Sequence, residues 1–329
     1  MGKRAVAVAR GGSTRRVTTR SLWSRHSIAL VGVIVLASGL LACSAAQEQD
    51  AAESALDDDA ITIASFDFAE SELLGEIYAR AIAARGYEVR HARRIGPREL
   101  VLPALAAGLV ELVPEYAGTS LEFLSRGSSV PSSDELVTHR TLVRVLQHTS
   151  VVALGPAPAQ SANAVVVRRE TARQLDLERI SDLEALAPRL TFGGPPECPG
   201  RPFCLEGLER VYGLAFQTFI PLDAGGPLTR QSLDSHHVDA AILFTTDPSV
   251  ATTRLVVLED DRRLQPAENV TPLVHEDVVR RWGDRLSQVI DGVSARLTTE
   301  GLRALNARVA SGETTQSVAA AWLQGQGLR

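Results

Sequence analysis

Short apolar runs alternate along the chain with segments in which apolar residues recur every three or four positions. The run Ile61–Phe66 ends at a polar turn, and residues 73–82 then place apolar side chains at helical spacing between charged ones. This pattern predicts a strand that feeds an amphipathic helix. Asp67 and Glu70 are spaced as a capping pair for the helix start, and Gly86 stands where a helix end favours a left-handed residue.

Further strand-like and helix-like segments follow in alternation. We expect strands at residues 88–92, 111–114, 190–193, 238–244 and 255–258, the second of them ending in a proline turn, and helices at residues 98–109 and 205–212. Strands that alternate with helices indicate an α/β fold with mostly parallel sheets flanked by helices. Ligands of such sheets bind beyond the carboxyl ends of the strands, so the turns after the strands are the candidate site.

The N-terminal region differs from the rest of the chain. Residues 1–27 contain seven basic residues and no acidic one, and the apolar stretch that follows is too short to span a membrane. Residues 1–42 are therefore predicted to be a cleaved signal peptide, and Arg15–Arg16 leaves both the general secretory and the twin-arginine export routes open. Cys43 ends the sequence Leu-Leu-Ala-Cys, which resembles the lipobox of bacterial lipoproteins, where the cysteine is acylated. The alternative is an ordinary secretory signal with an incidental cysteine.

The segment after Cys43 is acidic and poor in large apolar residues. We expect residues 43–60 to form a lipid-anchored flexible tether, followed by about 270 residues that suit one large domain or two lobes. Without the seven basic residues of the leader, 27 of the 34 Lys and Arg remain against 39 Asp and Glu, a net charge near −12. Nucleic acid is therefore not an expected partner.

Six segments of the mature chain, in order, resemble the substrate-binding proteins of bacterial ABC importers for osmoprotectants such as glycine betaine, choline and proline betaine. They are residues 66–78, 114–119, 156–159, 190–197, 256–261 and 297–300. The resemblance implies a clamshell of the type II periplasmic-binding-protein class, with residues 61–158 and 250–329 in lobe 1 and residues 159–249 in lobe 2. Hinge closure around the solute would then produce the form that the permease recognises.

A quaternary ammonium ion has no N–H to donate, so its site must hold it with aromatic ring faces and exclude water. The resemblance places Tyr116 at a cage tyrosine and Thr119 at a threonine that donates to a ligand carboxylate or hydroxyl. Phe244 stands where relatives often have tyrosine, and Phe66 lies in the turn after the first strand. For Tyr116 and Phe66, packing without ligand contact is the alternative.

Three further candidates in these turns are less specific. Ser71 stands where some relatives carry a ligand-contacting glutamine, and otherwise it is a solvated serine on a helix face. Thr246 and Asp247 follow Phe244 in its turn. Asp247 either contacts the ligand or accepts a hydrogen bond from the hinge backbone.

One segment departs from the family pattern. After residues 156–159 many relatives continue with Asn-Asn-Thr-Tyr, whose tyrosine is a cage wall, whereas this chain has Gln160 to Asn163 and places Asn163 at the wall. The loss of one ring–cation contact weakens the binding of a quaternary ammonium ion by roughly two-fold to thirty-fold. The amides of Gln160 and Asn163 suit a hydroxyl, a carboxylate or a primary amine, so the identity of the solute stays open.

Two cysteines, Cys198 and Cys204, bracket a loop rich in proline and glycine in a chain predicted to be exported. This setting predicts a disulfide that holds Phe203 or Glu197 toward the ligand, whereas two sulfurs are too few ligands for the alternative, a metal site. The chain contains no nucleophile elbow, phosphate loop or dinucleotide glycine motif. We therefore expect no enzyme activity, no metal and no cofactor.

The sequence thus predicts a monomeric lipoprotein at the outer face of the cytoplasmic membrane. It would capture a compatible solute such as glycine betaine, choline or proline betaine and deliver it to an ABC permease. The alternative is a clamshell lipoprotein that binds a different small polar amine or zwitterion, as a sensor or partner-protein module, without transport.

Overall fold

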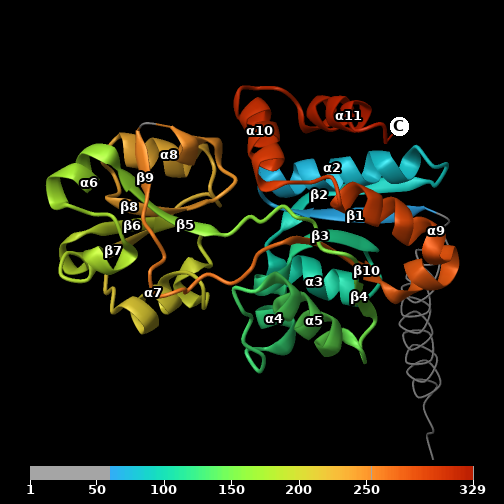
Figure 1. Cartoon of the computed structure of the whole chain (residues 1–329), viewed down its shortest axis with the longest axis horizontal. Helices are drawn as coiled ribbons and strands as arrows, with labels where there is room; N and C mark the ends of the chain where they lie inside the picture. Colours follow the sequence, from blue (N-terminus) through green and yellow to red (C-terminus); the bar gives the residue numbers. More distant parts are fainter. Residues whose placement is uncertain (1–59, 253, 329) are drawn as a thin grey trace, which may run out of the picture. The chain divides into compact units, whose positions relative to one another are not determined.

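The computed structural model describes residues 60–252 and 254–328, and this part of the chain contains two five-stranded sheets covered by helices (Figure 1). The predicted signal peptide, Cys43 and the tether up to residue 59 lie outside the described residues. Among the described helices, none combines the length and the apolar character that crossing a bilayer requires.

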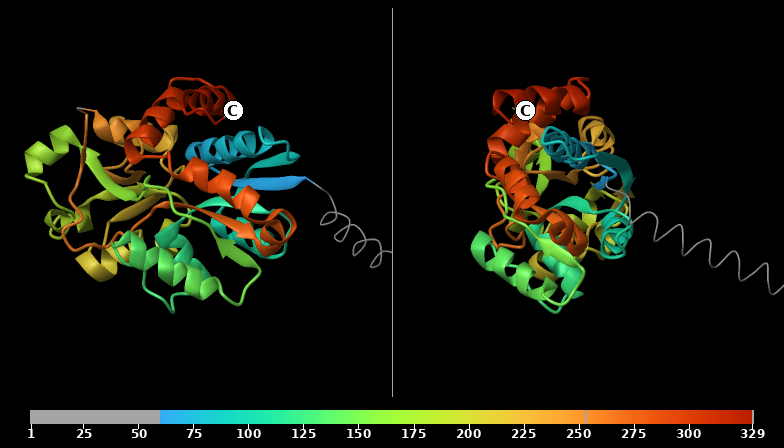
Figure 2. Two further views of the ribbon diagram at one scale, coloured as in Figure 1. Left: turned by 45° about the vertical axis from the view of Figure 1, so that its right-hand side comes forward. Right: turned by 90° about the vertical axis from the view of Figure 1, so that its right-hand side faces the viewer.

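The first sheet has the strand order β2-β1-β3-β10-β4, and we call it and its helices the first lobe. Helices α10 and α11, from the C-terminal part of the chain, pack against α2, as the views in Figure 2 also show. The strands are β1 (Ile61–Phe66), β2 (Val89–Gly96), β3 (Leu112–Tyr116), β4 (Val151–Ala153) and β10 (Val270–His275). The helices are α2 (Ala69–Ala83), α3 (Arg98–Ala106), α4 (Ala117–Ser125), α5 (Glu135–Leu146), α9 (Glu276–Ser294), α10 (Thr299–Ala310) and α11 (Thr315–Gly325).

The second sheet has the strand order β7-β6-β8-β5-β9, and we call it and its helices the second lobe. Its strands are β5 (Asn163–Arg168), β6 (Thr191–Gly194), β7 (Thr218–Pro221), β8 (Ala240–Phe244) and β9 (Leu255–Val257). Its helices are α6 (Arg169–Leu175), α7 (Leu205–Tyr212) and α8 (Pro227–Asp234). Short 3-10 turns lie at Ile180–Leu183, Ala187–Arg189, Cys198–Gly200 and Pro248–Ala251.

Both sheets are mixed, so the prediction of mostly parallel sheets is wrong. In the first lobe β1 pairs in parallel with β2 and β3, whereas β10 runs antiparallel to β3 and β4. In the second lobe β6 pairs in parallel with β7 and β8, whereas β5 runs antiparallel to β8 and β9. Strands β5 and β10 are the first strands that the chain forms after it crosses from the other lobe. Each begins at the end of its sheet where the parallel strands finish, and it therefore runs in the opposite direction to them.

The two lobes are joined by residues 154–162 and 258–269, between β4 and β5 and between β9 and β10. Strand β9 belongs to the second sheet, and Leu258 and Leu264 pack into the core of the second lobe. The second lobe therefore extends past residue 249, so its predicted end at that residue is wrong.

The first strand and helix follow the predicted pattern, with one exception at the helix start. β1 has the predicted bounds, and Gly86 beyond the end of α2 has φ +87°, in the left-handed region. Phe68, and not Asp67, is the residue that precedes α2, and no side chain caps this helix start. Glu70 instead accepts a hydrogen bond from Tyr116 Oη, so the predicted capping pair is wrong.

Strand β3 continues through the position where we expected a proline turn. Pro114 lies opposite Pro272 of β10 in the antiparallel register. Because neither residue of this pair has an N–H, the pair leaves no donor without a partner. The strand therefore continues to Tyr116, which lies at its carboxyl end.

Candidate functional site

A cavity of about 790 Å³ is lined by residues of both lobes. This volume lies within the usual range for sites that take small molecules. The last residues of β1, β3 and β8 and the residues that follow β1 and β6 contribute to its wall, as expected for ligand sites at the carboxyl ends of such strands.

Four aromatic rings in the cavity wall form a group that we call the aromatic cluster: Phe66, Phe68, Tyr116 and Phe244. The centroid of the Phe68 ring lies 6.1 Å from that of Phe66, 6.3 Å from that of Tyr116 and 5.6 Å from that of Phe244. Phe244 ends β8 in the second lobe, whereas Phe66 ends β1, Phe68 follows β1 and Tyr116 ends β3 in the first lobe. The ring contacts therefore join the two lobes. The cluster is apolar, and its ring faces attract cations.

Tyr116 is held firmly within this cluster. It is 6% exposed, and its Oη donates to Glu70 Oε1 at 2.8 Å. Glu70 Oε2 also accepts from Asn306 Nδ2 of α10 at 2.5 Å. Burial, and then the nearby Glu70 carboxylate, raise the pKa of Tyr116 well above its ordinary value, so the phenol remains neutral.

Carboxylates outnumber arginines in the cavity wall. The surplus makes the potential inside the cavity negative, which favours a cationic ligand. Burial also raises the pKa of Glu122 on α4. The acidic residues of the wall are Asp67, Glu99, Glu122, Glu197, Glu206, Asp223 and Glu268, and the basic ones are Arg98, Arg126 and Arg201.

Arg98 belongs to a buried ion pair behind the aromatic cluster. It is 8% exposed, and its partner Glu115 is fully buried. Arg98 Nη2 donates to Glu115 Oε2 at 3.1 Å, Arg98 Nε donates to Glu115 Oε1, and Glu115 Oε2 also accepts from Tyr116 N at 2.5 Å. The guanidinium carbon lies 5.3 Å from the centroid of the Phe66 ring. The pair therefore fixes Phe66 and Tyr116 from behind, and its positive charge is already compensated.

Two predicted ligand residues line the cavity, but a polar group of each is already hydrogen-bonded to another residue of the chain. The hydroxyl of Thr119 donates to Glu268 Oε1. The Nδ2 of Asn163 donates to the carbonyl of Phe203 at 2.9 Å. Of the predicted site residues, Phe66, Tyr116, Thr119, Asn163 and Phe244 thus reach the cavity.

Ser71 and Gln160 do not line the cavity. Ser71 is fully buried, and its Oγ accepts from Phe66 N at 2.8 Å, so this serine is not solvated but supports Phe66. The backbone N–H of Gln160 donates to Thr299 Oγ1 at 2.9 Å, and Gln160 forms an isolated bridge with Asn269. Ser71 therefore supports the cavity wall from behind, whereas the contacts of Gln160 are with residues outside the wall.

Thr246 and Asp247 also lie outside the cavity wall. The hydroxyl of Thr246 is 2.8 Å from that of Ser161, which lies in residues 154–162 between the two lobes. Asp247 Oδ1 accepts from Ser249 N at 2.8 Å, and Asp247 Oδ2 accepts from Arg230 Nη1 at 2.7 Å. Of the two roles considered for Asp247, these contacts correspond to the one in which it accepts from the backbone.

The predicted disulfide between Cys198 and Cys204 is confirmed. Its loop forms part of the cavity wall, and both Glu197 and Phe203 line the cavity. Within this loop, Arg201 Nη2 reaches across to α3 of the first lobe, 3.1 Å from each carboxylate oxygen of Glu99. The loop therefore connects the two lobes at the rim of the cavity.

Among the wall residues that were not predicted from the sequence, three bear on the chemistry of the site: Phe68, Arg98 and Glu268. Phe68 stands two positions after Phe66, so the position after the first strand could have predicted Phe68 as a site residue as well. Arg98 appeared only as the first residue of a helix. Nothing in the local sequence around Glu268 marks it as part of a site.

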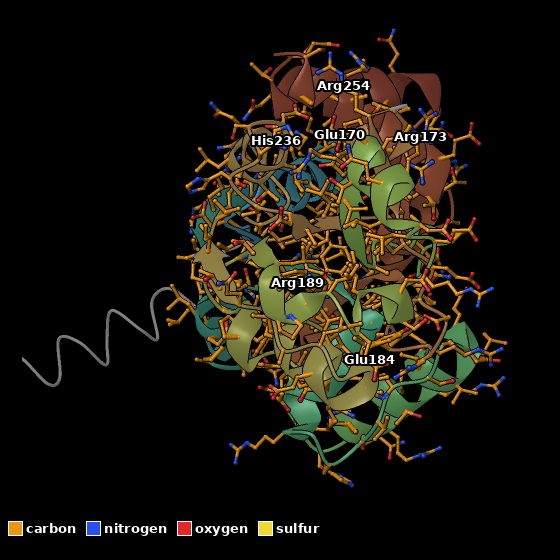
Figure 3. The ribbon with its side chains drawn as sticks, turned by 90° about the vertical axis from the view of Figure 1, so that its left-hand side faces the viewer. Glu170, Arg173, Glu184, Arg189, His236 and Arg254 are labelled. Atoms are coloured by element: carbon orange, nitrogen blue, oxygen red, sulfur yellow. A yellow bond between two sulfur atoms is a disulfide. The ribbon has the colours of Figure 1, made fainter. Side chains whose placement is uncertain are left out.

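The outer side of the second lobe contrasts with the cavity, because charges of both signs lie close together there. Glu170 Oε1, for example, is 3.2 Å from His236 Nε2. Figure 3 shows this side, where the labelled acidic residues are Glu170 and Glu184 and the labelled basic ones are Arg173, Arg189, His236 and Arg254. In the cavity wall, by contrast, acidic residues outnumber basic ones by seven to three.

The family model for the substrate-binding domain of ABC-type glycine betaine transport systems matches residues 59–325. The chain therefore belongs to this family of substrate-binding proteins, which are components of transporters and not enzymes.

Among its relatives is the glycine-betaine-binding protein of Pseudomonas aeruginosa, 29% identical over 269 residues that cover 78% of this chain and 85% of the relative. The glycine betaine-binding protein YehZ of Escherichia coli is 26% identical over 268 residues, covering 78% and 88%.

Solved structures of low sequence identity share the fold. A glycine betaine/carnitine/choline ABC transporter protein has a TM-score of 0.66 at 21% identity, over 82% of this chain and 99% of that one. Lactococcal OpuAC in its closed form with glycine betaine has a TM-score of 0.59 at 15% identity, over 82% and 97%. These similarities confirm the predicted two-lobed fold of the type II periplasmic-binding-protein class.

Proposed function

We propose that this chain is the extracytoplasmic receptor of an ABC importer, which captures a small quaternary ammonium solute and delivers it to the permease. Its membership of the glycine betaine family supports this function, as do two relatives named for binding glycine betaine. The solutes considered are glycine betaine, choline and proline betaine.

The observation that carries the proposal is the combination of the aromatic cluster and a carboxylate surplus in one cavity. A quaternary ammonium ion cannot donate a hydrogen bond, so it is recognised by ring faces and by negative charge at the distance of its methyl groups. Rings also cost little conformational entropy on binding, because each has only two side-chain torsions.

The two lobes provide a physical route from binding to transport. Phe68 of the first lobe and Phe244 of the second both line the cavity and contact each other, so a cation held against this pair of rings contacts both lobes. A ligand that contacts both lobes binds the closed form more tightly and shifts the population toward it. We infer that the permease distinguishes this closed form from the open one.

We further propose that Cys43 is acylated and that residues 43–60 tether a monomeric receptor to the outer face of the cytoplasmic membrane. A tether raises the concentration of the receptor near its permease. Replacement of Cys43 by alanine should release the protein from the membrane fraction. Retention of the variant in that fraction would contradict the anchor.

The test of the solute class is calorimetry and thermal-shift measurement on the purified chain. The panel contains glycine betaine, choline, carnitine, proline betaine, ectoine and polar amines. We expect at least one quaternary ammonium compound to bind with a Kd in the micromolar range. If only a non-methylated solute binds, the solute class is wrong and the receptor function remains.

A matched pair of variants tests the ring recognition. Phe244→Ala should weaken the binding of that quaternary compound by roughly two-fold to thirty-fold. Phe244→Leu keeps most of the apolar volume but removes the ring, so it should weaken binding nearly as much. If Phe244→Leu binds like the unmodified chain, then apolar contact alone explains the site.

A further inference from the structure

The carboxylate of Glu268 occupies an unusual place in the cavity wall. Glu268 lies in the segment that returns from β9 to β10, and it lines the cavity although it is only 3% exposed. Its Oε2 is 3.1 Å from the backbone nitrogens of Gly118 and Thr119, which donate to it, and its Oε1 accepts from the Thr119 hydroxyl.

Gly118 makes this arrangement possible. A Cβ at position 118 would lie 2.5 Å from Pro266 Cγ and 2.9 Å from the carbonyl oxygen of Ala267. Any side chain at position 118 would therefore push the returning segment away from α4. The close approach brings Glu268 to the N-terminus of that helix.

The N-terminus of α4 is one of the helix N-termini in this wall that suit an anion. Helix N-termini bind carboxylates and phosphates through their free N–H groups and the helix dipole. Here Ala117 N donates to Asn269 O at 3.0 Å, and the next two N–H groups donate to Glu268. The chain thus fills its own anion site with a buried carboxylate that faces the cavity.

The arginines of the wall do not offer a second anion site of similar strength. Arg98 and Arg201 each donate two hydrogen bonds to a carboxylate of the chain, Glu115 and Glu99. Arg126, the third arginine, is exposed. A carboxylate on the solute would therefore add to the negative surplus of the wall, whereas a simple cation would reduce it.

We propose that Glu268 is the specificity-determining group of this cavity and selects a small ammonium cation without a carboxylate, of the choline type, over zwitterionic betaines. This inference rests on the proposed function and adds the substrate class to it. Glu268 supplies negative charge in the cavity that the aromatic cluster also lines, and the filled helix N-terminus excludes the carboxylate of a betaine.

Proton exchange on binding reports what enters beside Glu268. Burial raises the pKa of this carboxyl to about 7, while the hydrogen bonds from Thr119 lower it. Arg98 on α3 and Glu115 on β3 are the other charged groups that act on it, in opposite directions. A bound cation stabilises the carboxylate and lowers its pKa, so the protein releases up to about half a proton at pH 7. A bound carboxylate has the opposite effect and causes proton uptake.

The experiment is calorimetry of the full chain with choline chloride and with glycine betaine, in buffers of different ionisation enthalpy at pH 7. Choline does not titrate near pH 7, and betaine is already ionised, so the exchanged protons come from the protein. We expect choline to bind at least about ten-fold more tightly than glycine betaine, with proton release. This measurement needs no variant and so does not depend on whether a variant folds.

Two glutamine variants complete the test. Glu268→Gln should weaken choline binding by roughly ten-fold and abolish the proton release, while the affinity for glycine betaine is unchanged or higher. Glu184→Gln removes the same charge from the outer side of the second lobe, labelled in Figure 3, and should leave both affinities unchanged.

The outcomes separate the inference from the proposed function. Tighter binding of glycine betaine than of choline, or proton uptake on choline binding, overturns the selection by Glu268, but the proposed receptor function for quaternary ammonium solutes remains. The same holds if choline binding is unchanged in Glu268→Gln. If no quaternary ammonium compound binds, the proposed function fails and this inference with it.

Discussion

The two walls of the cavity are built in different ways. The wall of the first lobe is a buried polar network, in which Arg98, Glu115, Tyr116 and Glu268 are each at most 8% exposed and each hydrogen-bonded inside the chain. The wall of the second lobe consists largely of a surface loop closed by a disulfide, and the side chain of its Arg201 is 28% exposed.

A receptor with a hinge can keep a defined site if one wall is rigid and the other adapts. A buried network of charges is stable only when every member has its partner. The side chains of the first wall therefore have a single stable arrangement. A surface loop has many arrangements, and the disulfide reduces their number in the unfolded chain. We infer that the first lobe holds the preformed half of the site and that the second lobe is the half that closes on it.

The largest effect should come from breaking the buried ion pair of the first wall. Arg98→Met leaves the Glu115 carboxylate without its partner at a fully buried position. An uncompensated buried charge costs about 3–5 kcal/mol, so the free energy of unfolding should fall by that amount in urea denaturation.

The double variant Arg98→Met with Glu115→Leu is the matched control for this prediction. It removes both charges and replaces them with apolar side chains, which often restores stability. We expect it to unfold at a higher urea concentration than Arg98→Met alone. If the single variant loses less than about 1 kcal/mol, then the first wall does not depend on a complete network.

The disulfide of the second wall should have an intermediate effect. Its cysteines are six positions apart, and the closure of so short a loop stabilises by about 2–3 kcal/mol in the chain-entropy model. The variant with both cysteines replaced by serine should therefore show a lower melting temperature. A thiol reductant should lower the melting temperature of the unmodified chain and leave that of the serine variant unchanged.

Ligand affinity in the serine variant tests the orientation of the loop separately from its stability. Glu197 and Phe203 both line the cavity beside the disulfide. If the disulfide holds them toward the ligand, then affinity falls together with the melting temperature. An unchanged affinity would mean that the disulfide acts on stability alone.

Local features of the fold could be predicted because local sequence determines them. The bounds of β1 and of α7 agree with the apolar spacing, and Gly86 has the left-handed conformation expected at a helix end. The direction of β5 and β10 could not be predicted in this way. It depends on the lobe from which the chain arrives, and the apolar pattern of a strand is the same in either direction.

The candidate site shows the same limit. Tyr116 and Phe244 were predicted from the family resemblance and Phe66 from its place after the first strand, and all three lie at strand ends, where sites of this fold lie. Glu268 was missed because its role arises from contacts with Gly118 and Thr119, about 150 positions earlier in the chain. The close approach at Gly118 that creates these contacts becomes visible only in the folded structure.

The smallest effect should come from the ion pair that joins the two walls. Arg201 and Glu99 have side chains that are 28% and 49% exposed, and pairs in such positions contribute about 0–1 kcal/mol because solvent screens them. Arg201→Ala should therefore leave the free energy of unfolding almost unchanged. The pair forms across the cavity rim, so its loss should instead favour the open form and speed up ligand release.

Stopped-flow dissociation of Arg201→Ala, Glu99→Ala and the double variant checks this, because the double variant should release ligand no faster than either single one. Additive increases in the dissociation rate would show that the two residues act independently and that the contact does not hold the walls together.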